Sequence, residues 1–164
     1  MVDELIGALR TSRDRALVSL YLSSGARASE LLGVRRDQVD WARQRVWVVS
    51  KGSRTLEPVP ASPESLQHLA AYFHEHSTPG PGEPIWRALH GKPRPLNDHV
   101  ARRVLQPANT ALGTDWSLHD LRHTTIDRVV TDPNLTLHRI CGRGLTRSCK
   151  RYRSTLPHSG RSRR

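Results

Sequence analysis

Two extended runs separated by a turn constrain the architecture that this 164-residue chain can adopt. Arg45–Val49 is rich in valine and tryptophan, Arg54–Val59 is a second extended run, and Ser50–Ser53 has the composition of a turn. This pattern predicts a β-hairpin with Lys51 at or near its tip. Because helical periodicity dominates on both sides of the hairpin, we expect a mainly α domain with a small antiparallel β-sheet, an α+β fold.

Capping residues and apolar periodicity together mark the expected helices. The first helix is expected to begin at a Ser12 cap and to cover Arg13–Leu22, and a short second helix to cover Ala28–Leu32. Each later helix follows a side chain that can accept a hydrogen bond from the first turn. These caps are Ser62, Asn97 and Ser117. After Ser62, the residues expected on the buried face are Leu66, Leu69, Ala70 and Phe73; after Asn97 the helix is expected to reach Leu105.

Positive charge is concentrated in the C-terminal segment. The formal net charge is +11, but nine basic residues and no acidic one follow Asp132, which leaves 17 basic and 15 acidic residues before that point. The high net charge therefore describes the end of the chain and not its body. Non-specific polyanion binding and a solvated tail without function both remain open for this segment. We divide the chain into a body, residues 1–137, and a basic tail, residues 138–164.

Composition also argues against several other classes of protein. No apolar run approaches the roughly 20 residues that span a bilayer, and the acidic start of the chain is unlike a secretory signal. We therefore expect a soluble cytoplasmic protein that does not bind membranes. Cys141 and Cys149 have neither a metal-ligand nor a redox spacing, so we expect a reduced pair and no metal site.

The helix expected after Ser117 carries the most informative polar pair. His119 and Arg122 are three residues apart, so both project from one face of the first turns. An imidazole and a guanidinium at a helix N-terminus can hold a phosphate. Such pairs also occur by chance on solvated helix faces, and the pair alone leaves both interpretations open.

Two other basic residues lie where loops turn sharply. Arg27 follows the turn at Gly25, and Glu30 is placed to pair with it. The alternative for this pair is an ordinary surface salt bridge that contributes under about 1 kcal/mol. Lys51 at the hairpin tip can likewise be a solvated turn residue.

Taken in order, three segments resemble the tyrosine recombinase family of the phage-integrase type. The segment GARASELLGV from Gly25 resembles the family's arginine segment G-[LA]-R-x-x-E-[LI]-x-x-L. KGSRTLEPVP from Lys51 resembles its lysine hairpin, and HDLRHT from His119 its H-x-L-R-H-[TS] box. The resemblance covers about residues 10–135 and implies a recombinase catalytic domain. It also implies double-stranded DNA and other recombinase protomers in a synaptic complex as partners.

The resemblance implies a definite reaction. A tyrosine hydroxyl attacks a DNA phosphodiester, forms a 3′-phosphotyrosyl link and releases a 5′-hydroxyl; rejoining then requires neither ATP nor a metal, so no cofactor is implied. By resemblance, Arg27 and Arg122 bind the non-bridging oxygens. Lys51 protonates the departing oxygen, and His119 transfers a proton or donates a hydrogen bond to the phosphate. Glu30 and His123 are implied as structural supports.

The basic tail departs from the family pattern. Relatives have a Gly-His pair and a tyrosine ten residues after that glycine. Here Arg143 follows Gly142, and Tyr152 lies ten residues after Gly142. Tyr152 is therefore the candidate nucleophile, with a coincidental tyrosine as the alternative, and Arg143 is a candidate phosphate contact.

Several interpretations of the whole chain stay open. The tail composition from about His138 is typical of out-of-frame translation of GC-rich DNA, which would have replaced the nucleophile helix. The chain also has no room for the separate helical clamp of its relatives, so we expect weak, strongly salt-dependent DNA binding. It is either a recombinase domain for site-specific DNA integration, or a catalytically dead mobile-element remnant that acts at most as a DNA-binding module. A helical domain unrelated to recombination, with a non-specific basic tail, is the third interpretation.

Overall fold

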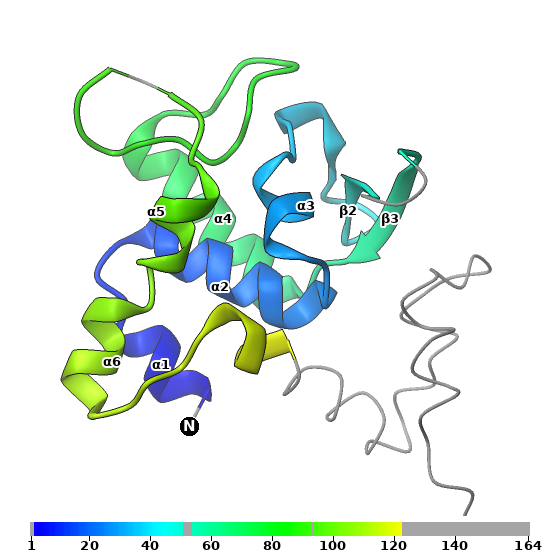
Figure 1. The fold of residues 1–164 in the computed structure, drawn as a ribbon. Helices are drawn as coiled ribbons and strands as arrows, with labels where there is room; N and C mark the ends of the chain where they lie inside the picture. The colour runs from blue at the N-terminus through cyan, green and yellow to red at the C-terminus, as the bar shows by residue number, and fades with distance from the viewer. Residues whose placement is uncertain (1, 51–53, 93, 123–164) are drawn as a thin grey trace, which may run out of the picture.

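The computed structural model describes residues 2–50, 54–92 and 94–122. It contains short helices around a three-stranded antiparallel sheet, which confirms the α+β expectation (Figure 1). In chain order the elements are α1 (Val2–Ala8), α2 (Ser12–Ser24), α3 (Ala28–Leu32), the 3₁₀ helix η1 (Arg36–Gln38), β1 (Val39–Asp40), β2 (Arg45–Val49), β3 (Leu56–Pro60), α4 (Pro63–His76), α5 (Asp98–Arg102) and α6 (Gln106–Leu112). Residues 118–122 are also helical.

Helix α2 runs through the middle of the molecule and packs chiefly against α4 (Figure 1). Its N-cap is Thr11, whose hydroxyl accepts a hydrogen bond from the Asp14 N–H at 3.1 Å. The predicted Ser12 cap is therefore wrong by one residue, because the Ser12 hydroxyl instead donates to the carboxylate of Glu75 on α4. The helix ends at Gly25, which has a left-handed backbone (φ 61°) that favours glycine.

The sheet has the order β1-β2-β3 and confirms the predicted hairpin. Val46 pairs with Val59 and Val49 with Leu56 across β2 and β3. The side chains of β2 alternate, so that Val46 is buried against the core while Trp47 is exposed. Lys51, at the predicted tip, lies outside the described residues.

Helix α4 begins as predicted, because the Ser62 hydroxyl accepts a hydrogen bond from the Ser65 N–H at 3.1 Å. The predicted buried face is confirmed for Leu66, Leu69 and Phe73. It is wrong for Ala70, which is exposed. Tyr72 is buried instead, since the contact with α2 and with the following loop covers a different side of the helix.

The helix predicted to run from Asn97 to Leu105 is shorter than expected. Asn97 does cap it, accepting from the Val100 N–H at 2.9 Å, but α5 ends at Arg102. A turn follows, and α6 begins at Gln106. Proline at position 107 has no N–H to donate to the carbonyl four residues earlier, so one continuous helix would lack that hydrogen bond.

The loop after α4 fixes α3 in place. Trp86 is fully buried, and its Nε1 donates to the Leu31 carbonyl at 2.8 Å. The neighbouring Ile85 N–H donates a hydrogen bond to the Val34 carbonyl at 3.1 Å. The Trp86 ring stacks on Tyr72 of α4 with the ring centroids 6.2 Å apart. These contacts hold the end of α3, and its other end carries Arg27.

Candidate functional site

Arg27 stands directly before the first residue of α3, held by a carboxylate from that helix. Glu30 accepts hydrogen bonds from the Arg27 backbone N–H at 2.9 Å and from its Nη1 at 3.1 Å. The Glu30 side chain is only 10% exposed, whereas that of Arg27 is 41% exposed. The pair therefore differs from a solvated surface ion pair. Its acidic member is sheltered by the protein, and the guanidinium has an open side.

The helix that follows Ser117 is capped from both directions, as predicted. The Ser117 hydroxyl accepts from the Asp120 N–H at 3.3 Å, and the Asp120 carboxylate accepts from the Ser117 N–H at 2.9 Å. This reciprocal arrangement is a capping box. Leu121 is 2% exposed and anchors the helix in the core. The position of Arg122 is therefore set by a cap and a buried leucine.

Acid should loosen this cap. The pKa of Asp120 is lowered, first because the Ser117 hydroxyl donates to its carboxylate and second because the Ser117 N–H does so. A lowered folded-state pKa means that the stabilisation is present above the unfolded pKa of about 4 and is lost as the pH falls through the folded value. We expect Ser117→Ala to lower the free energy of unfolding by about 1 kcal/mol at neutral pH. Urea denaturation should show this difference shrinking below about pH 4.

Ser62→Ala is the matched control for this test. It removes the serine cap of α4, whose hydroxyl also accepts from the third residue after it, but that residue is Ser65 and not an acid. Its cost should therefore change much less in acid. A Ser117→Ala deficit of constant size between neutral and acidic pH would contradict the role of Asp120 in the cap.

Arg122 carries a buried nitrogen without a hydrogen-bond partner, a feature that within the described ranges it shares with Arg36, whose guanidinium lies over the Trp41 and Phe73 rings. Arg122 is partly buried, and the atom concerned is its Nε, which is closed off from solvent. Within residues 2–50, 54–92 and 94–122 its guanidinium also makes no ion pair. A sheltered cation without a compensating charge is unfavourable unless an anion binds beside it.

Arg122 and Glu30 both act electrostatically on a tyrosine near the C-terminal end of α2. Tyr21, in the last turns of that helix, is 4% exposed. Burial raises the pKa of Tyr21, the charge of Arg122 lowers it and the charge of Glu30 raises it. Arg122 and Glu30 thus lie within electrostatic reach of one phenol, and Glu30 is bound to Arg27. Figure 1 shows the segment that ends at residue 122 beside the same end of α2.

The other predicted site residues are distributed as follows. His119 is exposed and lies on the same helical segment as Arg122, one turn earlier. The structure therefore pairs Arg27 with Glu30, and it places Arg122 on the same helical segment as His119. The remaining candidates lie outside the described residues: Lys51, His123, Arg143 and Tyr152.

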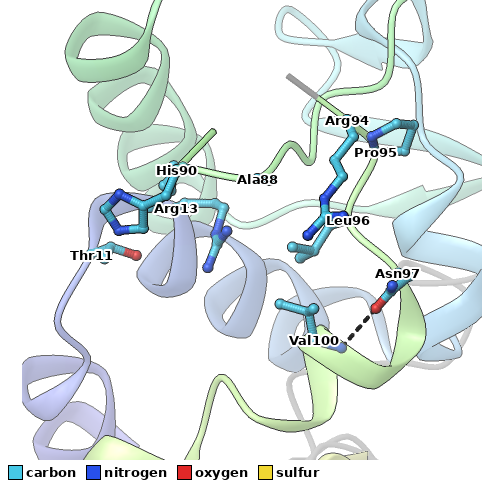
Figure 2. Close-up of a pocket in the computed structure, with 10 residues that line it drawn as sticks. Thr11, Arg13, Ala88, His90, Arg94, Pro95, Leu96, Asn97 and Val100 are labelled. Carbon is cyan, nitrogen blue, oxygen red and sulfur yellow. Dashed lines mark hydrogen bonds between the residues drawn. The ribbon is translucent and has the colours of Figure 1, made fainter. Parts of the chain in front are cut away.

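A pocket of about 280 Å³ lies at the opposite end of α2 (Figure 2). Its polar lining residues are Thr11, Arg13, His90, Arg94 and Asn97. Unlike Arg122, Arg13 has a partner for each guanidinium nitrogen: its Nε and Nη2 donate to the Asp14 carboxylate at 2.9 and 2.6 Å, and its Nη1 donates to the Arg87 carbonyl at 3.2 Å. The pocket is therefore distinct from the cluster around Arg122, which we call the arginine site: Arg27, Glu30 and Arg122.

Other kinds of site are not found in the described part of the chain. There, no three or more His, Cys, Asp or Glu side chains are grouped so that they could hold a metal ion. None of the helices in the same ranges combines the length and apolar character needed to cross a bilayer. The arginine site is built from guanidinium groups, which recognise phosphates and carboxylates.

Known proteins with a similar sequence decide the family. The model of the phage integrase family matches residues 1–131. The chain belongs to the phage integrase family. Tyrosine recombinase XerC of Stutzerimonas stutzeri is 34% identical over 113 residues, which are 68% of this chain and 37% of that protein. Tyrosine recombinase XerD of Lacticaseibacillus casei is 29% identical over 127 residues, 72% of this chain and 41% of XerD. This phage integrase family member thus spans about two fifths of the length of these relatives.

Solved structures of recombinases have the same fold. XerA recombinase superimposes with a TM-score of 0.68 at 21% identity, over 98% of this chain and 64% of XerA. XerH bound to its difH substrate gives 0.65 at 14% identity, over 81% of this chain and 42% of XerH. A lambda integrase dimer bound to a COC′ core site gives a TM-score of 0.61 at 14% identity, over 87% of this chain and 55% of the lambda integrase chain. At these identities the similarity establishes the fold of this phage integrase family member.

Sequence reasoning did not find two residues that shape the arginine site. Tyr21 lies within the helix predicted over Arg13–Leu22, but periodicity does not distinguish a buried tyrosine from a buried leucine. Trp86 lies in a stretch of loops without periodicity. The signal for Trp86 is the short apolar pair that it forms with Ile85 between two Gly/Pro-rich segments. Such a pair does not reveal what it packs against.

Proposed function

We propose that this chain is the catalytic domain of a site-specific DNA recombinase that cleaves and rejoins strands through a 3′-phosphotyrosyl intermediate. The observation that carries the proposal is the partly buried guanidinium of Arg122, whose sheltered Nε has no hydrogen-bond partner and whose charge, like that of Glu30 in the Arg27–Glu30 pair, acts on the Tyr21 phenol. Two cations so placed can hold the two non-bridging oxygens of one phosphodiester. Membership of the phage integrase family supports the same conclusion.

The proposed partners follow from the substrate. Double-stranded DNA is the ligand, and further recombinase protomers would complete a synaptic complex. Among the similar structures, the XerH recombinase is bound to a difH substrate and the lambda integrase is a dimer on a core site, which supports both kinds of partner. A DNA substrate also implies a cytoplasmic location. We assign the catalytic role to the body, residues 1–137, together with Tyr152 from the basic tail.

In the proposed reaction, the Tyr152 hydroxyl attacks the phosphorus, and the bond from phosphorus to the 5′-oxygen breaks. The tyrosine proton leaves to a base, and Lys51 donates a proton to the departing 5′-oxygen. The charge that develops on the non-bridging oxygens is stabilised by Arg27 and Arg122. Attack of a second strand's 5′-hydroxyl on the phosphotyrosine forms a new phosphodiester bond and releases the tyrosine, so each step exchanges one phosphoester bond for another.

His119 has the remaining polar role in the proposal. It is exposed on the same helix as Arg122, where an imidazole can either accept the nucleophile's proton or donate a hydrogen bond to the phosphate. Its neighbour His123 is proposed as a support behind the helix. Arg143 occupies the position of the family's histidine and is proposed as an additional phosphate contact.

A nicked suicide duplex tests the proposal directly. Cleavage next to the nick releases a short fragment, so the covalent protein–DNA adduct cannot be resealed and is retained on a denaturing gel. We expect an adduct with the full chain and none with Tyr152→Phe. Tyr72→Phe is the control, because it removes a hydroxyl from the core that accepts a hydrogen bond from the Arg87 N–H and should leave the adduct in place.

The second candidate function is a DNA-binding module without catalytic activity. It is favoured by Arg143, which replaces the histidine of the family pattern, and by the unusual composition of the basic tail. Duplex binding without any adduct, in both the wild type and Tyr152→Phe, would select the module and reject the enzyme. Translating the gene in its other frames would show whether a Gly-His pair with a tyrosine ten residues after the glycine has been lost by a frameshift.

A further inference from the structure

The pocket at the N-terminal end of α2 has no role in the proposed reaction. It has a volume of about 280 Å³, and its walls come from the start of α2, from the loop at residues 88–97 and from α5. Thr11 and Arg13 line it at one end of α2, whereas Gly25 and the Arg27–Glu30 pair follow the other end. The pocket is therefore a separate place on the molecule where a ligand could bind.

The charged side chains that line the pocket are all basic. Among the described lining residues, Arg13, His90 and Arg94 are basic and none is acidic. Arg13 is compensated, because the Asp14 carboxylate accepts from its Nε and Nη2. Arg94 is exposed, and its side chain forms no hydrogen bond or ion pair with a residue in the described ranges. The pocket thus has a positive charge that the described residues do not compensate.

The polar groups of the pocket also have donors to spare. Thr11 Oγ1 accepts from the Asp14 N–H at 3.1 Å, and Asn97 Oδ1 accepts from the Val100 N–H at 2.9 Å. The Thr11 hydroxyl and the Asn97 Nδ2 donate to no residue in the described part of the chain. Because the acceptor oxygens are engaged and the donors are not, the lining suits a ligand rich in acceptors, such as an oxyanion.

The loop wall of the pocket is held in place by hydrogen bonds within the protein. The Ala88 N–H donates to the Arg94 carbonyl at 2.9 Å, and a β-bridge joins Arg87 to Pro95. Arg13 Nη1 donates to the Arg87 carbonyl at 3.2 Å and so ties the loop to α2. A wall fixed in this way lowers the cost of ordering when a ligand binds.

We propose that this pocket is a second anion site, which binds a phosphate group through Arg94, Thr11 and Asn97. Figure 2 shows the Arg13 and Arg94 side chains reaching into the pocket from α2 and from the loop. Donors therefore come from both walls. A phosphate presents acceptor oxygens in several directions and can use them together, whereas a carboxylate has only two oxygens in one plane.

The phosphate group can belong to a small phosphorylated molecule or to the backbone of DNA. The volume of about 280 Å³ is at the lower end of the range for ligand pockets, so the ligand inside it is small or is one group of a larger molecule. Part of the lining is apolar, with Leu89, Leu96 and Val100, and offers contacts to the carbon atoms beside the phosphate. The inference does not rest on the proposed function, because neither Arg27 nor Arg122 takes part in it.

Titration of the full chain with inorganic phosphate, followed by ¹H–¹⁵N NMR spectra at constant ionic strength, tests the site. We expect saturable shifts of the Asn97 side-chain amide and of the Ala88 and Leu89 backbone amides. Arg94→Gln should weaken this binding about tenfold or more, because it removes a charge-assisted hydrogen bond. Arg45→Gln is the control, since it makes the same chemical change at an exposed position on β2 and should leave the affinity of the pocket unchanged.

A second variant reverses the charge of the pocket and keeps the cap of α5. Aspartate caps a helix as well as asparagine does, so Asn97→Asp retains an acceptor for the Val100 N–H and replaces the free donor with a negative charge. We expect phosphate to cause no saturable shift in this variant. Ser62→Asp is the matched control, because it adds the same charge at the cap of α4, near the contact between the Ser65 and Ser23 hydroxyls at the other end of α2.

The affinity for a fluorescein-labelled duplex at several salt concentrations identifies the source of the phosphate. If DNA supplies it, Arg94→Gln should lower the slope of log affinity against log salt concentration by about 0.9. An unchanged slope, with phosphate binding lost, assigns the pocket to a small phosphorylated molecule. The site is overturned if phosphate causes no saturable shift in the full chain, or if Arg94→Gln and Asn97→Asp leave the shifts unchanged. Variants of Arg27 and Arg122 are not needed for either result, so the proposed function can fail while this site stands.

Discussion

Trp86→Ala is expected to lower the free energy of unfolding by about 3–5 kcal/mol, a large part of the roughly 5–15 kcal/mol that keeps a typical domain folded. The side chain is fully buried, stacks on Tyr72 and donates a hydrogen bond to the Leu31 carbonyl. Its removal leaves a cavity and also withdraws the contact that holds the end of α3. Chemical denaturation followed by circular dichroism measures the loss.

Trp47→Ala provides the matched control, since it makes the same chemical change on the outer face of the sheet. Trp47 is 38% exposed, so its truncation removes fewer buried contacts and should cost clearly less. A third variant, Trp86→Phe, retains most of the ring and removes the indole donor, for which we expect a loss of about 1 kcal/mol. If Trp86→Ala were no more destabilising than Trp47→Ala, the account of how α3 is held would be wrong.

The parts of the fold that could be predicted from sequence are those whose signals are local. Ser62, Asn97 and Ser117 were recognisable as caps because a short side-chain oxygen satisfies N–H groups two or three residues away. The hairpin was recognisable because alternation and turn composition lie in one continuous stretch. At the start of α2 two adjacent hydroxyls compete, and the contact that removes Ser12 from the cap comes from Glu75 on another helix.

What could not be predicted depends on contacts between distant segments. Ala70 and Tyr72 both fit a plausible apolar face of α4, and only the packing of the following loop decides between them. The same holds for Trp86, which is buried because its loop passes over α3. For the candidate site, the pairing of Arg27 with Glu30 was expected from their spacing and is confirmed, whereas a phosphate shared by Arg27 and Arg122 was implied only by the family resemblance. That Arg122 and Glu30 both act electrostatically on Tyr21 is a relation between distant segments, which no local pattern predicts.

The structure allows phosphate binding by the basic tail to be distinguished from phosphate binding by the arginine site. The net positive charge of the basic tail would attract any polyanion, irrespective of the body. The arginine site is different, because its cations are held in fixed positions, one by a carboxylate and the other by a partly buried helix. A phosphate bound there would be fixed in position, whereas a phosphate bound by the tail would only be attracted. This difference can be measured through the dependence of affinity on salt.

Arg27→Ala combined with Arg122→Ala is expected to make duplex binding both weaker and less sensitive to salt. Each phosphate contact on B-DNA contributes about 0.9 to the slope of log affinity against log salt concentration, so the slope should fall by about two. If the chain forms the covalent adduct, removing either arginine should slow that step by about 10²–10³. Fluorescence anisotropy at four or more salt concentrations gives the slope, and a suicide-substrate time course gives the rate.

Arg10→Ala with Arg43→Ala is the control, because it removes the same net charge from exposed positions. Arg10 precedes α2, and the 13 residues of that helix place it about 20 Å along the axis from the arginine site. Arg43 lies in the turn between β1 and β2, paired with Asp40 at 3.3 Å. Long-range attraction by net charge would reduce affinity equally in both double variants. If Arg27 and Arg122 contact a phosphate directly, only their double variant should show a smaller slope of log affinity against log salt concentration. Equal slopes in the two double variants would reject the arginine site as the place where DNA binds.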